Sequence, residues 1–210
     1  PNVNFIGVEI DAALLEVIGS GILSVKSRGG RISSDNYGVS LINGGKIKGG
    51  TGNVEVTGTG GPSGNGNNGY GVHIVGANSE ISSTGGSVVV TAQGGSNSGN
   101  FINHIGLVLD QGSISAGGSG SLTVQGTGAN GIGGDGHSGI EMTNGAAISS
   151  GGGDVSVTGQ GGSASSTGLT DREGLVMNNS SISAAGNGSI VVLGTGGDAR
   201  GVGNKGVVTS

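Results

Sequence analysis

Two histidines have the types and spacing that could bind a metal ion. His104 and His137 each stand two residues before a glycine of a motif that recurs about every 33 residues. If each repeat is one coil of a solenoid, the two imidazoles stack about 5 Å apart, which is the spacing of neighbouring strands. Arg172 follows in this column, and Asn36 and Asn204 take the same place in outer coils. A metal needs a third ligand and an arginine repels cations, so we expect solvated loop histidines, with a weak metal or pH-sensitive site as the alternative.

Acidic side chains are the next candidates, because sugar-cleaving enzymes use a pair of them. Glu9 and Glu141 share the outward column of the first strand of the repeat, but four coils, about 19 Å, separate them. The string from Gly134 to Ser138 is similar to the Gly-His-Gly of polygalacturonase-like enzymes, although the partner aspartates and the Arg-Ile-Lys string of those enzymes are missing. We therefore predict no enzymatic activity, and we assign no catalytic, cofactor-binding or metal-binding residue.

Aromatic platforms, which carbohydrate-binding surfaces usually present, are scarce in this chain. Tyr37 and Tyr70 each directly precede a recurring glycine, one coil apart, so we expect them to stack on each other. We interpret the pair as a small clamp at the loop corner rather than as a sugar site.

Two functions that depend on regular ladders are disfavoured. Calcium-binding nonapeptides need an aspartate, which Gly117–Ser121 lacks, and their period is nine residues rather than about 33. Ice-binding solenoids present flat threonine ladders, and here other side chains interrupt the threonine column: Lys26, Thr57, Thr91, Gln125, Thr158 and Leu193.

An internal repeat defines the elements that must position these side chains. Each unit opens with a glycine followed by two apolar residues with one residue between them, and these leading glycines are 31 to 35 residues apart. A second apolar position follows eight to ten residues later, and then a third strand with two inward residues and a Gly-Gly pair. The second positions are Leu15, Ile47, Ile81, Ile114, Ile148 and Ile182.

This pattern predicts an all-β fold, a right-handed parallel β-helix with three short strands per coil and about six coils of 31–35 residues. We expect a single β-helix domain over residues 1–210. Its coils start at Gly7, Gly38, Gly71, Gly106, Gly139 and Gly174, with a partial seventh coil from Gly206.

Turns and variable segments complete each unit. Asn43, Asn78, Asn144 and Asn179 precede the second strand, where we expect stacked asparagines that satisfy turn backbones. Seven to eleven residues vary before each leading glycine, and such insertions on one corner of a solenoid form its default binding surface.

Composition narrows the range of partners. The chain has 53 glycines without a collagen-like period and a net charge of −5. Its densest basic cluster is Lys26, Arg28 and Arg31, too small for a nucleic-acid surface, and no apolar run approaches the roughly 18 residues of a membrane span. We therefore expect neither nucleic-acid binding nor membrane insertion.

The repeat units resemble those of filamentous-haemagglutinin-like bacterial exoproteins, most closely at Asn53–Gly61 and Asp154–Gly162. Such repeats fill very large secreted proteins of Gram-negative bacteria and cyanobacteria. The resemblance implies an extracellular or cell-surface location and a structural or adhesive role in a fibre, stalk or filament. It offers no catalytic residue to carry over.

Partners follow from the expected ends of the solenoid. Uncapped β-helix coils expose backbone edges that pair with other strands, so we expect contacts with other copies or with adjoining β-helix segments. Cell-surface glycans and host or neighbouring cells are further expected partners. The alternative function is a glycan-binding or glycan-processing β-helix of the tailspike or pectin-lyase-like kind.

Overall fold

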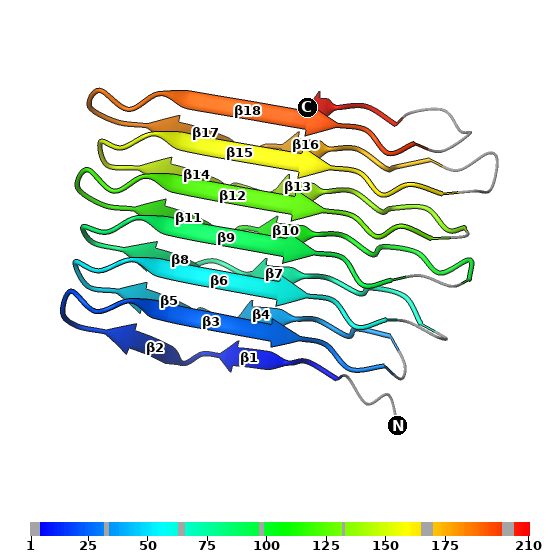
Figure 1. The fold of residues 1–210 in the computed structure, drawn as a ribbon, viewed down its shortest axis with the longest axis horizontal. Helices are drawn as coiled ribbons and strands as arrows, with labels where there is room; N and C mark the ends of the chain where they lie inside the picture. Colours follow the sequence, from blue (N-terminus) through cyan, green and yellow to red (C-terminus); the bar gives the residue numbers. More distant parts are fainter. Residues whose placement is uncertain are drawn as a thin grey trace.

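Three parallel sheets wind into a right-handed solenoid (Figure 1). The computed structural model describes residues 5–31, 34–62, 66–96, 99–131, 133–164, 170–198 and 204–210. Consecutive strands along the chain lie in different sheets, and each strand pairs in parallel with the strand three places later. The predicted fold class, a parallel β-helix with three strands per coil, is confirmed.

Each sheet collects one strand from every coil. Sheet A contains β1 (Val8–Asp11), β4 (Val39–Ile42), β7 (Val72–Val75), β10 (Leu107–Asp110), β13 (Ile140–Thr143), β16 (Leu175–Asn178) and β19 (Val207–Thr209). Sheet B contains β2 (Leu14–Val17), β5 (Lys46–Gly49), β8 (Glu80–Ser83), β11 (Ser113–Ala116), β14 (Ala147–Ser150) and β17 (Ser181–Ala184). Sheet C contains β3 (Leu23–Arg28), β6 (Val54–Thr59), β9 (Val88–Gln93), β12 (Leu122–Thr127), β15 (Val155–Gln160) and β18 (Ile190–Thr195).

The register of the strands places equivalent residues of successive sequence repeats side by side. Val54 pairs with Val88, and Val88 pairs with Leu122, so equivalent residues of successive coils form columns. Because side chains alternate between the two faces of a strand, a column that starts inward stays inward. The interrupted threonine column is present in this register, from Lys26 opposite Thr57 to Thr158 opposite Leu193.

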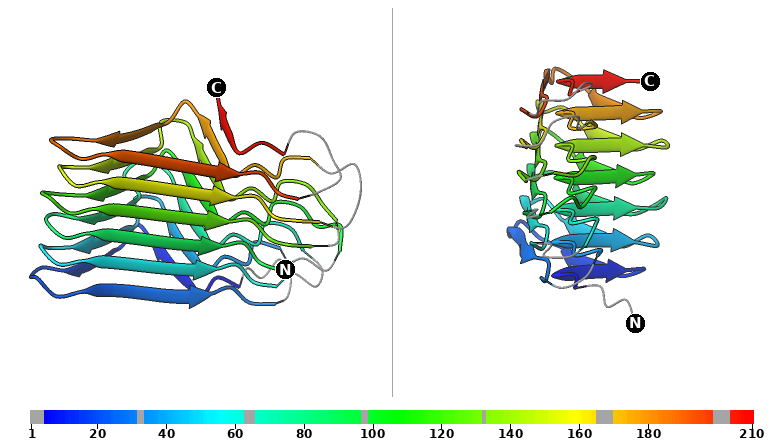
Figure 2. Two further views of the ribbon diagram at one scale, coloured as in Figure 1. Left: turned by 45° about the horizontal axis from the view of Figure 1, so that its top comes forward. Right: turned by 90° about the vertical axis from the view of Figure 1, so that its right-hand side faces the viewer.

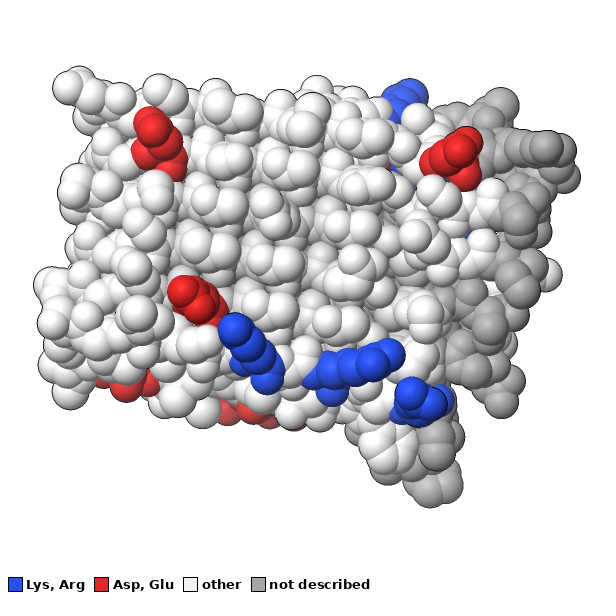
Figure 3. All heavy atoms as spheres, viewed as in Figure 1, with Lys and Arg blue, Asp and Glu red and all other residues white. Residues whose placement is uncertain are grey.

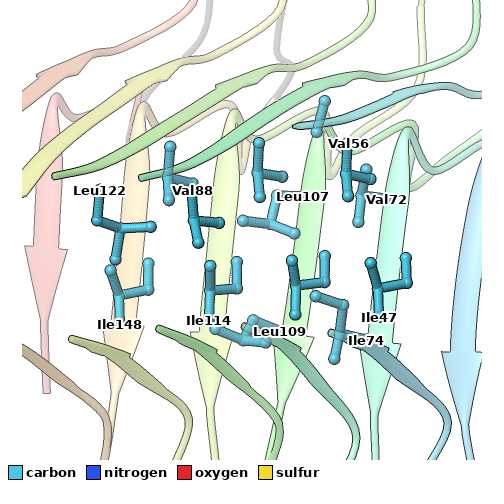
Figure 4. Packing of buried hydrophobic residues seen from close by; sticks show 14 of the residues in the cluster. Ile47, Val56, Val72, Ile74, Val88, Leu107, Leu109, Ile114, Leu122 and Ile148 are labelled. Atoms are coloured by element: carbon cyan, nitrogen blue, oxygen red, sulfur yellow. The ribbon is translucent and has the colours of Figure 1, made fainter. Parts of the chain in front are cut away.

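Apolar columns from the three sheets meet in one continuous core (Figure 4). Ile47, Ile81, Ile114 and Ile148 are fully buried, and Val and Leu side chains of sheets A and C pack against them. Full burial of such a side chain contributes about 1.5–3 kcal/mol, so the stacked columns are the main source of stability.

The leading glycines mark the places where the coil is narrowest. A Cβ atom on Gly38 would lie 2.4 Å from the backbone nitrogen of Thr59, at the far end of the same coil. Gly71, Gly106, Gly139 and Gly174 have equivalent contacts at 2.3–2.4 Å. Only glycine fits there, which explains why this residue opens every described repeat.

The asparagine column has the predicted turn role but a different contact. Asn43, Asn78, Asn144 and Asn179 adopt positive φ angles between 46° and 70°, a conformation that asparagine tolerates better than most residues. Asn43 Nδ2 donates a hydrogen bond to Asp11 Oδ1 of the preceding coil, and the Asn144 amide does the same to Asp110.

Beyond the contact between each leading glycine and the end of the third strand, the chain extends into a side structure that we call the loop lobe (Figure 2). It comprises the described parts of residues 29–37, 60–70, 94–105, 128–138, 161–173 and 196–205. Parts of the variable segments predicted from the sequence lie outside the described residues. Among the described residues, no helix is long and apolar enough to cross a membrane.

Candidate functional site

In the loop lobe, the segment that follows each third strand runs close beside a segment that precedes a leading glycine, and we call these two segments the limbs of the lobe. The backbone amide of Gly95 donates to the carbonyl of Gly69 at 2.7 Å, and the amide of Ala129 donates to that of His104 at 2.9 Å. A Cβ atom on Gly94 would lie 2.2 Å from the His104 oxygen, and one on Gly60 equally close to the Gly69 oxygen. The Gly-Gly pairs after the third strands are therefore required by close backbone approach.

A polar column lies between these limbs. His104, His137 and Arg172 have no exposed surface, and the two imidazole centroids are 5.3 Å apart. The predicted spacing of about 5 Å is confirmed, although the two rings are inclined by 60° rather than stacked, and the interpretation as solvated loop histidines is wrong. The limbs pack on each other closely enough to exclude water, and the sequence gives no sign of that packing.

Hydrogen bonds fix the arrangement of this column. The backbone amide of His104 donates to His137 Nδ1 at 3.1 Å, so His137 carries its proton on Nε2, which lies 3.3 Å from the Gly133 carbonyl. The Arg172 guanidinium donates to the carbonyls of Gly162, Gly133 and Gly134. Both nitrogens of His137 thus have protein partners.

Burial sets the protonation states in the column. It lowers the pKa of His104 to about 4, and burial together with the charge of Arg172 lowers the pKa of His137 to about 3. Both imidazoles are neutral at pH 7. Within the described part of the chain no group of three possible ligands gathers around a metal position. The column is best explained as a packed polar interior.

A second cluster lies on the outer face of sheet A, where the loop lobe joins it. The Tyr37 and Tyr70 rings are parallel to within 4° with centroids 4.9 Å apart, which confirms the predicted stack. His73 of β7 contacts both rings, at 4.5 and 5.4 Å, and its Nδ1 lies 3.2 Å from Ser40 Oγ. Sequence analysis missed His73 as a partner, although it follows Tyr70 by three residues.

Polar groups hold the aromatic cluster in place. The Tyr37 hydroxyl donates to Asp35 Oδ1 at 3.0 Å, and Asn68 Nδ2 donates to the same oxygen at 2.9 Å. Burial, followed by the charge of Asp35, raises the pKa of Tyr37, while burial lowers the pKa of His73 to about 4. The cluster is therefore uncharged apart from Asp35.

Two carboxylates on the same face lie closer than the sequence columns indicate. Ser138 Oγ donates to Glu173 Oε2 at 3.3 Å and also lies beside Glu141. Burial raises the pKa of Glu141, and the neighbouring charge of Glu173 adds to this rise. The separation of Glu9 and Glu141 is as predicted, but Glu173 was not considered because only strand residues were compared. Reading the residue before each leading glycine as a further column would have found Glu173.

The structure therefore contains two small clusters on sheet A, one aromatic and one of carboxylates, and a closed polar interior in the loop lobe. The aromatic cluster and the carboxylate pair are two coils apart along sheet A, about 10 Å, and the charge of Glu141 still contributes to the raised pKa of Tyr70. Glu9, the other acidic residue of the strand column, lies four strands away from Glu141. No protein-family model, curated protein or solved structure matches this chain.

Proposed function

We propose that this chain is a non-enzymatic structural module of an extended β-helical rod whose terminal coils stack on further coils of the same kind. The supporting observation is the contrast in exposure within single core columns. Ile47 is fully buried, whereas Leu15, its neighbour in the first coil, is 40% exposed. At the other end Val155 is 1% exposed and Ile190, next in its column, is 46% exposed.

Large apolar surfaces at both ends favour association. The exposed apolar side chains of the first and last coils include Leu14, Ile18 and Ile22 at one end and Val192, Leu193 and Val207 at the other. Unpaired strand edges accompany them, because β3 and β18 each have a partner on one side only. A further coil in register would bury these side chains and complete the hydrogen bonding of the edges.

We further propose that the rod is extracellular, at a bacterial cell surface, and serves adhesion or a fibre. This part of the proposal rests on the resemblance of the repeat units to filamentous-haemagglutinin-like exoproteins.

Negative-stain electron microscopy over a series of protein concentrations tests the structural proposal. We expect rods that lengthen with concentration while keeping the width of one solenoid. Single short rods of constant length at the highest concentration would overturn it.

A glycan-binding role is the second candidate, and Glu141, which is partly exposed on the outer face of sheet A beside the buried Glu173, favours it. Acidic side chains accept hydrogen bonds from sugar hydroxyls. A glycan array of the wild type and of a variant without the two carboxylates tests this candidate, because only binding at this pair depends on both side chains. Binding that the double variant Glu141→Gln, Glu173→Gln abolishes would support the second candidate.

A further inference from the structure

An open groove lies where sheet C meets the loop lobe. It has a volume of about 230 Å³ and crosses the ends of three successive strands, β3, β6 and β9. Its lining consists of Arg28, Thr59, Gly60, Gln93, Gly94, Ser96 and Asn130. The groove is polar and runs along the axis of the solenoid, separate from both clusters on sheet A.

The lining offers both hydrogen-bond donors and hydrogen-bond acceptors. Thr59 supplies a hydroxyl, and Gln93 and Asn130 supply amides. Both amides are held in place: Gln93 Nε2 donates to the carbonyls of Gly94, Thr127 and Gly128, each at 3.4 Å, and Asn130 Oδ1 accepts from the Ser163 amide at 2.8 Å. A row of fixed hydroxyl and amide groups suits the hydroxyls of a sugar.

A positive edge borders one end of the groove. Lys26 and Arg28 lie on β3, the lowest strand of sheet C, and Arg31 follows three residues after this strand. Figure 3 shows this basic row at the lower edge of the face, with one acidic side chain beside it and others scattered elsewhere on the face. All three are exposed, and within the described residues none has a carboxylate at ion-pair distance. Lys46 and Lys48, in contrast, both pair with Glu80, at 3.5 and 3.2 Å.

We propose that this groove binds an acidic glycan, with the carboxylate or sulfate of one sugar unit at Arg28 and neighbouring hydroxyls along Thr59, Gln93 and Asn130. An arginine fork binds such anions through two parallel hydrogen bonds. Lys26 and Arg31 extend the anion site to adjacent units. Nucleic acid is a poorer fit, because the described residues that line the groove include no aromatic side chain for base stacking and the chain has a net charge of −5.

Calorimetric titration of the intact chain tests this proposal with three probes of equal length: an oligogalacturonate, a heparin oligosaccharide and a neutral cello-oligosaccharide. The first two separate carboxylate from sulfate recognition, and oligothymidylate serves as a fourth, non-sugar polyanion. The variants are Arg28→Gln and Gln93→Ala. Lys48→Gln is the matched control, because it removes the same charge from the outer face of sheet B. Circular dichroism establishes that every variant is folded.

We expect at least one acidic sugar to bind and the neutral sugar not to bind. Arg28→Gln should weaken binding about tenfold or more, as loss of a charge-assisted hydrogen bond predicts. Gln93→Ala should weaken it severalfold without a change in charge, and Lys48→Gln should alter it less than about twofold, since screened surface charges contribute little. Failure of both acidic sugars to bind would overturn the proposal. Equal losses from Arg28→Gln and Lys48→Gln, or equally tight binding of oligothymidylate, would also overturn it.

Discussion

Burial determines the charge states of the polar side chains inside the loop lobe. His104, His137 and Arg172 are fully enclosed, so their environment is set by backbone carbonyls and amides rather than by water. The imidazoles are neutral and the guanidinium keeps its proton, because arginine stays charged even where burial lowers its pKa. The column therefore contains one charge, whose terminal nitrogens donate to carbonyl oxygens and which the nearby charge of Asp135 also stabilises.

The lowered histidine pKa values predict a loss of stability in mild acid. His73, His104 and His137 bind protons in the unfolded chain below about pH 6.5, but in the folded chain only near pH 4 or lower. Stability is thus complete above pH 6.5 and falls as the pH drops towards 4, by about 2 kcal/mol for each histidine at pH 5. Urea unfolding at pH 7 and pH 5 measures this loss.

The raised pKa of Glu141 acts in the opposite direction, so a variant must isolate the histidines. His137→Gln should lose less stability than the wild type between pH 7 and pH 5. Identical urea midpoints of the wild type at the two pH values would contradict the buried, neutral column.

Arg172 is expected to be the most sensitive polar residue of the lobe. Arg172→Met leaves the carbonyls of Gly162, Gly133 and Gly134 without a donor and should lower the free energy of unfolding by about 3 kcal/mol. Lys48→Met, which removes a partly exposed ion pair with Glu80, should cost less than about 1 kcal/mol. Equal effects of the two changes in thermal unfolding would refute the role of Arg172.

At the scale of the elements, the shape of each coil depends on close backbone contacts that leave no room for a side chain. The leading glycine of a repeat lies against the end of the third strand and separates the apolar core from the polar lobe. Gly139→Ala places a Cβ atom 2.3 Å from the Gln160 nitrogen and should destabilise the chain by about 2 kcal/mol. Gly19→Ala meets no atom within 4 Å and should be neutral or slightly stabilising. Chemical denaturation of both variants checks the contrast, and similar midpoints would count against it.

The sequence predicted the strands and their register well, because each core column repeats the same apolar type at nearly constant spacing. Ile47, Ile81 and Ile114 are identified as neighbours by period alone, and they are neighbours in sheet B. The closed interior of the lobe and the Glu141–Glu173 pair were not predictable in this way. They depend on how irregular limbs fold back, and the variable segments have no period to indicate it.

At the scale of the whole molecule, the three sheets do not end at the same level. Sheet A has seven strands and sheets B and C have six, so β19 stands one level beyond β17 and β18. A second copy that places its β1 on β19 leaves a gap of one strand, about 4.8 Å, in the other two sheets. We therefore expect copies of this chain to associate with rising concentration, but less tightly than copies whose three sheets end at one level.

A chain shortened to Pro1–Asp198 lacks β19 and ends all three sheets at the same level. Its last coil can meet the first coil of another copy over the full cross-section, with Ile190 against Leu23 and Ile182 against Leu15. We expect this chain to associate at least tenfold more tightly than the intact one, as light scattering over a concentration series would show. Equal or weaker association would argue against stacking through the coil ends.

Sedimentation velocity of matched variants tests the central claim, that the coil ends are the associating surfaces, most directly. Ile190→Lys places a charge in the exposed end of the core, whereas Val89→Lys places one on the outer face of sheet C in the middle of the rod, at similar exposure of 46% and 38%. We predict that the wild type and Val89→Lys associate with rising concentration and that Ile190→Lys remains monomeric. Unchanged association of Ile190→Lys, or a monomeric wild type at every concentration, would contradict the account.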